Sequence, residues 1–109
     1  MAFSPEYRAL VEEKLSSVVP IRTKAMFGGV GIYSSDLFFA LIAEDKLYFK
    51  VDDTNRADYE AAGMEPFYPY DSTTPMHYWE LPAKILNDAK ELAVWIDKSL
   101  CVAARKKKR

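Results

Sequence analysis

The sequence predicts an α+β domain in two layers, with helices packed on one antiparallel β-sheet in the order α-β-β-β-α-β-β-α. Apolar residues recur at helical spacing near both ends, and short apolar runs joined by polar links lie between them. The links at 34–36 and 44–46 are so short that they join antiparallel neighbours, because a parallel crossover needs about a dozen residues or more. With 109 residues, half of them apolar, the chain fits a single domain over residues 1–109.

The first helix is predicted to begin after Ser4 and to end before Pro20. Ser4 is a suitable N-cap, Pro5 fits the first helical position, and Glu6 favours the positive end of the helix dipole. Pro20 cannot continue the helix. The apolar face expected to pack on the sheet consists of Tyr7, Leu10, Val11 and Leu15.

Three extended runs follow, at 26–33, 37–43 and 47–51. The second run is apolar on both faces, which is typical of a central strand covered on both sides. The third alternates, with Leu47 on one face and Lys50 on the other. These three runs are therefore expected to form the centre of the sheet.

The middle of the chain is predicted to hold a second helix and two more extended pieces. The polar residues at 52–54 offer helix caps, and Gly63 is expected just after the helix end, where a left-handed conformation is common. The extended pieces lie at 67–70 and 76–80, and Pro69 makes the first of them an edge or irregular strand.

A last helix is expected from about Asp88, with Glu91 as its capping partner three residues later. The basic tail, residues 105–109, continues this helix, and it is expected to be a frayed, solvated end. The apolar stripe of the helix consists of Ile85, Ala89, Leu92, Ile96, Leu100 and Ala103.

The net charge of −1 combines an acidic body with this basic tail. The tail carries +5, whereas the other 104 residues hold 10 basic and 16 acidic side chains and so carry −6. That balance argues against a direct nucleic-acid binder, except through the tail. The residues that would make such a contact are Arg105, Lys106, Lys107, Lys108 and Arg109.

No apolar run is long enough to span a membrane, and the N-terminus does not have the pattern of a signal peptide. The single cysteine fits a reducing compartment. We therefore expect a cytoplasmic protein that has no contact with a membrane.

The residues offer no arrangement for catalysis, a cofactor or a metal. One cysteine, Cys101, and one histidine, His77, cannot make the usual four-ligand Cys/His zinc site. No serine or cysteine is spaced to pair with His77, and Cys101 is expected beside the core on the last helix. The glycines at 28–31 lead into neither a helix nor a Gly-Lys-Ser/Thr sequence, so a phosphate loop is not expected. The sequence thus predicts a protein that is not an enzyme.

The candidate interaction residues are aromatic and basic. Of the 15 aromatic residues, 12 lie within 27–79, where core packing is preferred over a stacking platform for single-stranded nucleic acid, because few basic residues lie nearby. The run Tyr78-Trp79 is also typical of a partner-binding surface. In the run 27–33, two glycines and two aromatic residues share one strand face, and the bare glycines let another backbone approach closely. Arg56 either binds an anion or pairs with acids within one helical turn. The candidate surface consists of Phe27, Gly29, Gly31, Tyr33, Lys50, Arg56, Tyr78 and Trp79.

Short motifs along the chain follow the order of a known family. They are Met-Phe-Gly-Gly-Val-Gly-Ile-Tyr at 26–33, Phe-Ala-Leu-Ile-Ala at 39–43, Leu-Tyr-Phe-Lys-Val-Asp at 47–52, Asn-Arg at 55–56, Gly-Met-Glu-Pro-Phe at 63–67, Met-His-Tyr-Trp at 76–79 with Pro82, and Leu-Asn-Asp at 86–88 ahead of Trp95. Over about residues 4 to 105, the chain resembles the TfoX N-terminal domain family of competence regulators, which also includes Sxy.

The resemblance implies a small two-layer α+β fold, in agreement with the element order above. It also implies a regulatory, non-enzymatic role, because the named members activate competence genes, the genes for DNA uptake and transformation, together with the cyclic-AMP receptor protein. Those regulators carry a second, C-terminal domain, whereas we expect this sequence to be a stand-alone N-terminal domain.

Three hypotheses for function follow. The first is a regulatory or protein-interaction domain that acts through its sheet edge or aromatic surface, with a protein partner or as a homodimer. The second is a weak nucleic-acid binder that uses the basic tail, with an affinity that falls steeply as salt rises. The third is a small-molecule sensor with an aromatic pocket between helices and sheet.

Overall fold

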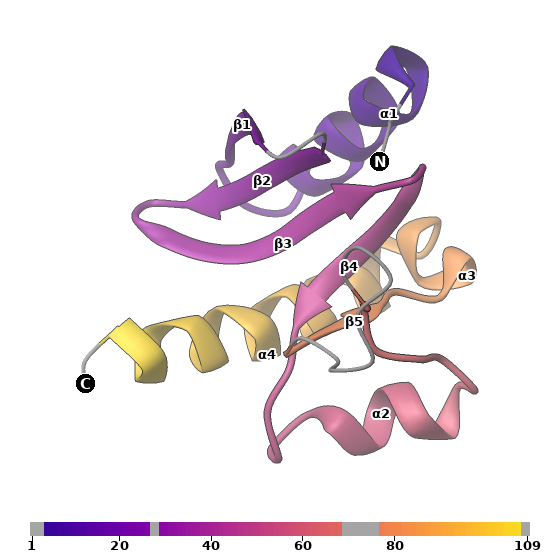
Figure 1. Ribbon diagram of the computed structural model, residues 1–109, viewed down its shortest axis with the longest axis vertical. Helices are drawn as coiled ribbons and strands as arrows, with labels where there is room; N and C mark the ends of the chain where they lie inside the picture. The colour runs from indigo at the N-terminus through magenta and orange to yellow at the C-terminus, as the bar shows by residue number, and fades with distance from the viewer. Residues whose placement is uncertain (1–3, 27–28, 69–76, 108–109) are drawn as a thin grey trace.

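The structure, a computed structural model, describes residues 4–26, 29–68 and 77–107. Five antiparallel strands form one sheet in chain order, β1-β2-β3-β4-β5 (Figure 1). The strands are β1 (Arg22–Met26), β2 (Gly29–Ser34), β3 (Leu37–Ala43), β4 (Lys46–Lys50) and β5 (Tyr78–Glu80). The helices are α1 (Pro5–Ser16), α2 (Arg56–Ala61), α3 (Ala83–Leu86) and α4 (Ala89–Lys107). The predicted α+β class, with helices on an antiparallel sheet, is confirmed.

Helix α1 begins as its sequence predicts. The Ser4 hydroxyl accepts a hydrogen bond from the Tyr7 backbone N–H at 3.1 Å, and Pro5 occupies the first turn. Val11 and Leu15 are fully buried against the sheet, but Leu10, expected on the same face, is 40 % exposed. The packed stripe of α1 is therefore narrower than the spacing alone indicates.

The run predicted as one strand at 26–33 is divided between two strands. Met26 is the last residue of β1 and Gly29 the first of β2, and Arg22 of β1 pairs with Tyr33 of β2. Strand β1 was not predicted, because its exposed basic residues interrupt the apolar alternation by which a strand is recognised. The central strand, β3, has the predicted bounds Leu37–Ala43.

Helix α2 begins later than the caps at 52–54 predict. Its first residue is Arg56, and its N-cap, Asn55, makes no side-chain capping bond. Asp52 instead shapes the preceding turn, because its carbonyl oxygen accepts from the Arg56 N–H at 3.0 Å. The predicted end is confirmed: Gly63 has φ +76°, and the Met64 N–H donates to the Tyr59 carbonyl at 2.9 Å.

The pairing predicted around 67–70 lies earlier in the chain. Pro66 forms a single bridge with Trp79, and the Phe67 N–H donates to the Tyr78 carbonyl at 2.7 Å. The segment 69–76, which includes Pro69 and Met76, lies outside the described residues. Of the extended piece predicted at 76–80, β5 contains Tyr78–Glu80.

The last helix, α4, starts as predicted, since the Asp88 carboxylate accepts from the Glu91 N–H at 3.3 Å. Two residues of the predicted stripe lie elsewhere: Ile85 belongs to α3, and Ala89 is exposed in the first turn. On α4, Ser99 and Val102, which the predicted stripe did not include, are buried. A helix that packs over a twisted sheet buries a broader face than a single sequence stripe.

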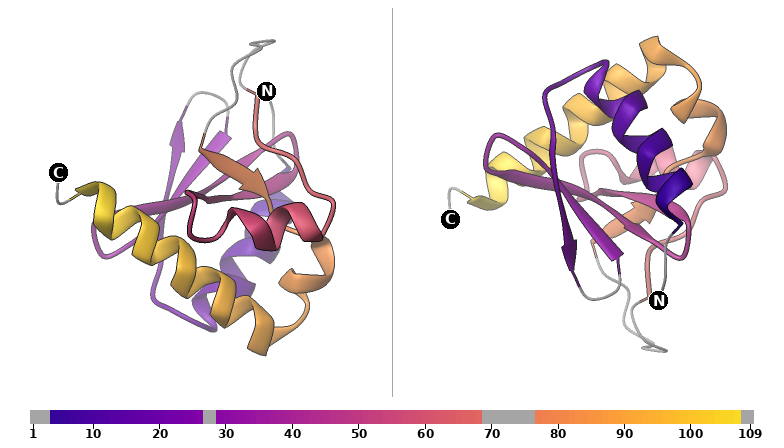
Figure 2. Two further views of the ribbon diagram at one scale, coloured as in Figure 1. Left: turned by 90° about the horizontal axis from the view of Figure 1, so that it is seen from below. Right: turned by 90° about the horizontal axis from the view of Figure 1, so that it is seen from above.

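The helices cover one face of the sheet, as the two views of Figure 2 show. The larger core lies between this face and the helices, and it includes Val11, Ile32, Phe39, Ile42, Phe49, Tyr59, Leu92 and Ile96. A second, smaller cluster forms on the opposite face, and its buried members are Ala43, Tyr48, Phe67 and Tyr78, with Phe38 and Leu41 partly buried against them. The alternation of β4 is confirmed, because Leu47 lies in the first cluster and Tyr48 in the second.

Candidate interaction surface

A row of five side chains crosses the sheet on the face opposite the helices. We call it the aromatic–basic row, and its members in spatial order are Arg22, Tyr33, Phe38, Lys50 and Tyr78. Strand register produces the row, because Arg22 pairs with Tyr33, Tyr33 with Phe38, and Lys50 with Tyr78. Residues directly opposite each other on neighbouring strands share a face of the sheet.

The row holds two cations and three rings, in the order cation, ring, ring, cation, ring. The Arg22 guanidinium carbon lies 5.0 Å from the Tyr33 ring centroid, and the Tyr33 and Phe38 rings stack with centroids 4.9 Å apart. The Lys50 Nζ lies 5.9 Å from the Phe38 centroid and 5.7 Å from that of Tyr78. The faces of the Tyr33 and Phe38 rings thus lie against neighbours, so these two rings offer their edges, which carry positive partial charge, to an incoming partner.

The rest of this face is closed by an aromatic contact. The ring centroids of Phe67 and Tyr48 are 4.8 Å apart, and the Phe67 N–H donates to the Tyr78 carbonyl, as described above. Burial and the nearby Glu80 carboxylate raise the pKa of Tyr48 to about 12, so this phenol is neutral at physiological pH. Burial also raises the pKa of Tyr78. This end of the face is buried and mainly apolar, whereas Tyr33 and Phe38 are only partly buried.

The glycines of the candidate surface occupy the same face as the row. Gly31 pairs with Lys24 on one side and Leu41 on the other. A Cβ atom at Gly29 would lie 2.4 Å from the Ile42 carbonyl oxygen of β3. The close backbone approach predicted for the glycine run is therefore confirmed at Gly29. Phe27 lies outside the described residues.

Two members of the predicted surface lie apart from the row. Trp79 points to the helix side, where its ring centroid is 6.4 Å from that of Tyr59. Arg56 is on α2 and forms ion pairs with Asp53 and, at 3.8 Å, with Glu60. The local pairing expected for Arg56 is confirmed.

Sequence reasoning missed Arg22 and Phe38, although one signal for Phe38 was present. The polar link at 34–36 closes a hairpin, and a hairpin that tight places Tyr33 close to residue 38 across the turn. No comparable signal marked Arg22, because the strand that carries it was not predicted.

The beginning of the basic tail is anchored rather than frayed. Helix α4 extends through Lys107, and Arg105 Nη2 lies 2.9 Å from Asp52 Oδ2 and 2.8 Å from Thr54 Oγ1. Partial burial raises the pKa of Asp52, but hydrogen bonds from Thr54 and then from Arg105 outweigh it and lower the value to about 2. Lys108 and Arg109 lie outside the described residues.

A cleft of about 270 Å³ lies between α1, β4 and α3. Its described walls are mainly aliphatic, from residues such as Leu10, Leu47 and Leu86, and among the described residues that line it Tyr7 is the one aromatic residue. Asp45 and Glu80 contribute carboxylates to its rim. This cleft therefore does not have the lining expected of an aromatic pocket between helices and sheet.

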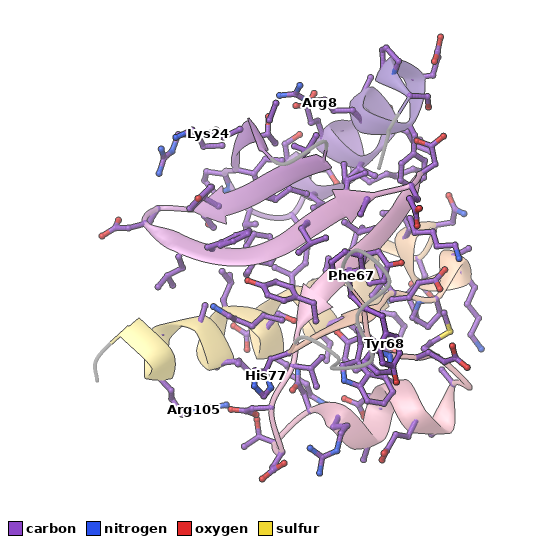
Figure 3. The ribbon with its side chains drawn as sticks, viewed as in Figure 1. Arg8, Lys24, Phe67, Tyr68, His77 and Arg105 are labelled. Atoms are coloured by element: carbon purple, nitrogen blue, oxygen red, sulfur yellow. The ribbon has the colours of Figure 1, made fainter. Side chains whose placement is uncertain are left out.

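The two residues considered for catalysis are both exposed. His77 precedes β5 (Figure 3), and its carbonyl accepts from the Val51 N–H at 2.9 Å. Cys101 lies exposed on α4 rather than beside the core. Within residues 4–26, 29–68 and 77–107, no three His, Cys, Asp or Glu side chains gather as metal ligands would. In the same part of the chain, no helix combines the length and hydropathy needed to cross a bilayer.

The sequence matches one protein family over most of its length. A sequence model of the TfoX N-terminal domain matches residues 13–103, from the second half of α1 through most of α4. No curated protein matches the sequence.

Proposed function

Because the chain belongs to the TfoX N-terminal domain family, we propose that it is a non-enzymatic regulatory domain that works by binding a protein partner in the cytoplasm. The process would be transcriptional control of the kind that the family's competence regulators carry out. The observation that carries the proposal is the aromatic–basic row, which the helices leave uncovered.

The composition of the row supports protein binding over other uses. Aromatic residues and arginine are enriched at protein interfaces, and this face brings partly buried Tyr33 and Phe38 together with exposed Arg22. Tyr68, the residue after Phe67, is 48 % exposed and adds another accessible ring.

The stacking geometry argues against a platform for nucleic-acid bases. Such a platform needs ring faces open to the bases, but the faces of Tyr33 and Phe38 lie against each other and against Arg22 and Lys50. Ring edges and cations together favour an acidic surface. We therefore propose an acidic protein as the partner, with a homodimer as the alternative assembly.

The test is site-specific photo-crosslinking in cells. A photoreactive phenylalanine analogue replaces Tyr33 in one variant and Val94 in a matched control, since Val94 is 47 % exposed and apolar but lies on α4. The proposal expects a discrete crosslinked protein of the transcription machinery from position 33 and not from position 94. Crosslinking that is equal at both positions, or none at position 33, would overturn it.

A further inference from the structure

Strand β1 lies at one margin of the sheet, and no described segment pairs with its outer edge (Figure 1). The opposite margin is different, since residues 65–67 cover part of β5. We propose that β1 is a docking edge that takes up an extended acidic segment of the partner as an additional antiparallel or parallel strand. This inference rests on the proposed function and specifies the chemistry and mode of binding of the partner.

The charges on β1 favour such a partner. Arg22 and Lys24 are both exposed and, being two residues apart, lie on the same face of the strand, which is the face of the aromatic–basic row. Figure 3 shows Lys24 at the outer margin of the sheet. A partner strand with acidic residues at positions i and i+2 would place them directly opposite these two cations.

The edge is held in place before any partner arrives. Thr23 points to the helix side, where its hydroxyl accepts from Arg8 Nη2 at 3.0 Å and donates to Glu12 Oε2 at 2.7 Å. Arg22 is held by the Tyr33 ring and by a 3.2 Å hydrogen bond from its Nη2 to the Ser35 carbonyl. Little ordering of β1 is therefore required on binding, which favours affinity.

The same charges disfavour a second copy of the chain on this edge. A two-fold axis that pairs β1 antiparallel with its own copy runs perpendicular to the sheet, so both copies keep Arg22 and Lys24 on the same face. Cations would then lie opposite or diagonal to cations, and like charges at opposed positions destabilise a strand pair. The edge therefore disfavours self-pairing while it favours an acidic strand.

The probe is a fluorescent seven-residue peptide that alternates glutamate with threonine, and binding to the full chain is measured by polarisation. Lys24→Glu is expected to weaken binding about tenfold or more, because an attraction becomes a repulsion. Lys90→Glu, an exposed lysine in the first turn of α4, is the matched control and should leave the affinity unchanged.

Two N-methylated peptides test strand addition itself. One carries methyl groups on the glutamate amides and the other on the threonine amides, and alternate residues of a strand direct their amides to opposite sides. Strand addition requires that one peptide loses binding and the other keeps it, and that outward amides of β1 exchange hydrogen more slowly in the complex.

The outcomes separate this inference from the proposed function. Binding that survives both methylations but falls with Lys24→Glu overturns strand addition, while crosslinking from position 33 still supports a partner on the face. Equal effects of Lys24→Glu and Lys90→Glu, or no binding of the unmodified peptide at millimolar concentration, overturn the docking edge as well.

Discussion

Replacing Asp52 with asparagine isolates the ion pair that ties the end of α4 to the turn before α2. Asp52 Oδ1 accepts hydrogen bonds from the Thr54 backbone N–H, at 2.8 Å, and from its hydroxyl, whereas Oδ2 receives Arg105 at 2.9 Å. Asparagine keeps an oxygen for Thr54 but removes the negative charge. The substitution therefore changes the contact with Arg105 and leaves the turn its acceptor.

The size of the effect follows from the pKa of Asp52, which is lowered from 3.8 to about 2 in the folded protein. This lowering corresponds to about 2 kcal/mol, since each pKa unit is about 1.36 kcal/mol. The hydrogen bonds from Thr54, for which asparagine keeps an acceptor oxygen, contribute more to it than Arg105 does. That energy is an upper bound, because the side chains of Asp52 and Arg105 are 26 % and 50 % exposed and solvent screens them. We expect Asp52→Asn to lower the free energy of unfolding by about 1 kcal/mol at pH 7.

Urea unfolding from pH 7 down to pH 2 measures this contribution. A carboxyl group whose folded-state pKa is lowered stabilises the protein above its unfolded pKa, and that stabilisation is lost as pH falls through the folded value. The difference between wild type and Asp52→Asn should therefore be constant above about pH 5 and shrink between about pH 4 and pH 2. Asp53→Asn is the control, because the Asp53 side chain is 88 % exposed.

Two results would refute this reasoning. One is a loss at pH 7 that is no larger for Asp52→Asn than for Asp53→Asn. The other is a difference between wild type and Asp52→Asn that stays the same down to pH 2, which would mean that the charge is not its source.

Three further predictions concern the sheet and the tail. Gly29→Ala should lower the free energy of unfolding, measured in urea, by about 2 kcal/mol, because the new Cβ meets the Ile42 carbonyl oxygen. Gly63→Ala should lower it by only about 1 kcal/mol, because Gly63 has φ +76° but no atom within 4 Å of the new Cβ. Equal losses for the two variants would contradict the close approach at Gly29. The free energy of unfolding should fall as pH rises from about 10 towards 12, because Tyr48 loses its proton at a lower pH in the unfolded chain than in the folded protein. Tyr48→Phe should make this fall less steep. An unchanged slope in the variant would contradict the argument that burial raises the pKa of Tyr48. Deleting residues 106–109 keeps the ion pair between Arg105 and Asp52, so calorimetry should find the melting temperature unchanged. A clear drop in the melting temperature would mean that the deleted basic residues stabilise the fold.

Elements whose signals lie in neighbouring residues of the chain were predictable from sequence. Strand β3 and the start of α1 follow from residues that act locally, namely a double-sided apolar run and the Ser4 cap. The edge strand β1 was not predictable in this way. Its contacts join residues far apart in the chain, such as the hydrogen bonds of Thr23 with Arg8 and Glu12, which lie 15 and 11 positions away.

For the interaction surface, the sequence likewise indicated the residue types but not which of them share a face. Sequence identified its ingredients, Tyr33, Lys50 and Tyr78, but grouped them with Trp79 and Arg56, which point elsewhere. A side chain's face depends on strand register, and register across β2, β3 and β4 is fixed by hairpin and bulge geometry rather than by composition.

The sequence by itself determined the fold class, the family and the separation of an acidic body from a basic tail, because apolar periodicity, motif order and charge are properties of the chain alone. Only the tertiary structure decided which cations meet which rings, that Arg105 turns back to Asp52, and that β1 forms an open basic edge. These contacts join residues from 11 to 53 positions apart, so they exist only once the chain has folded.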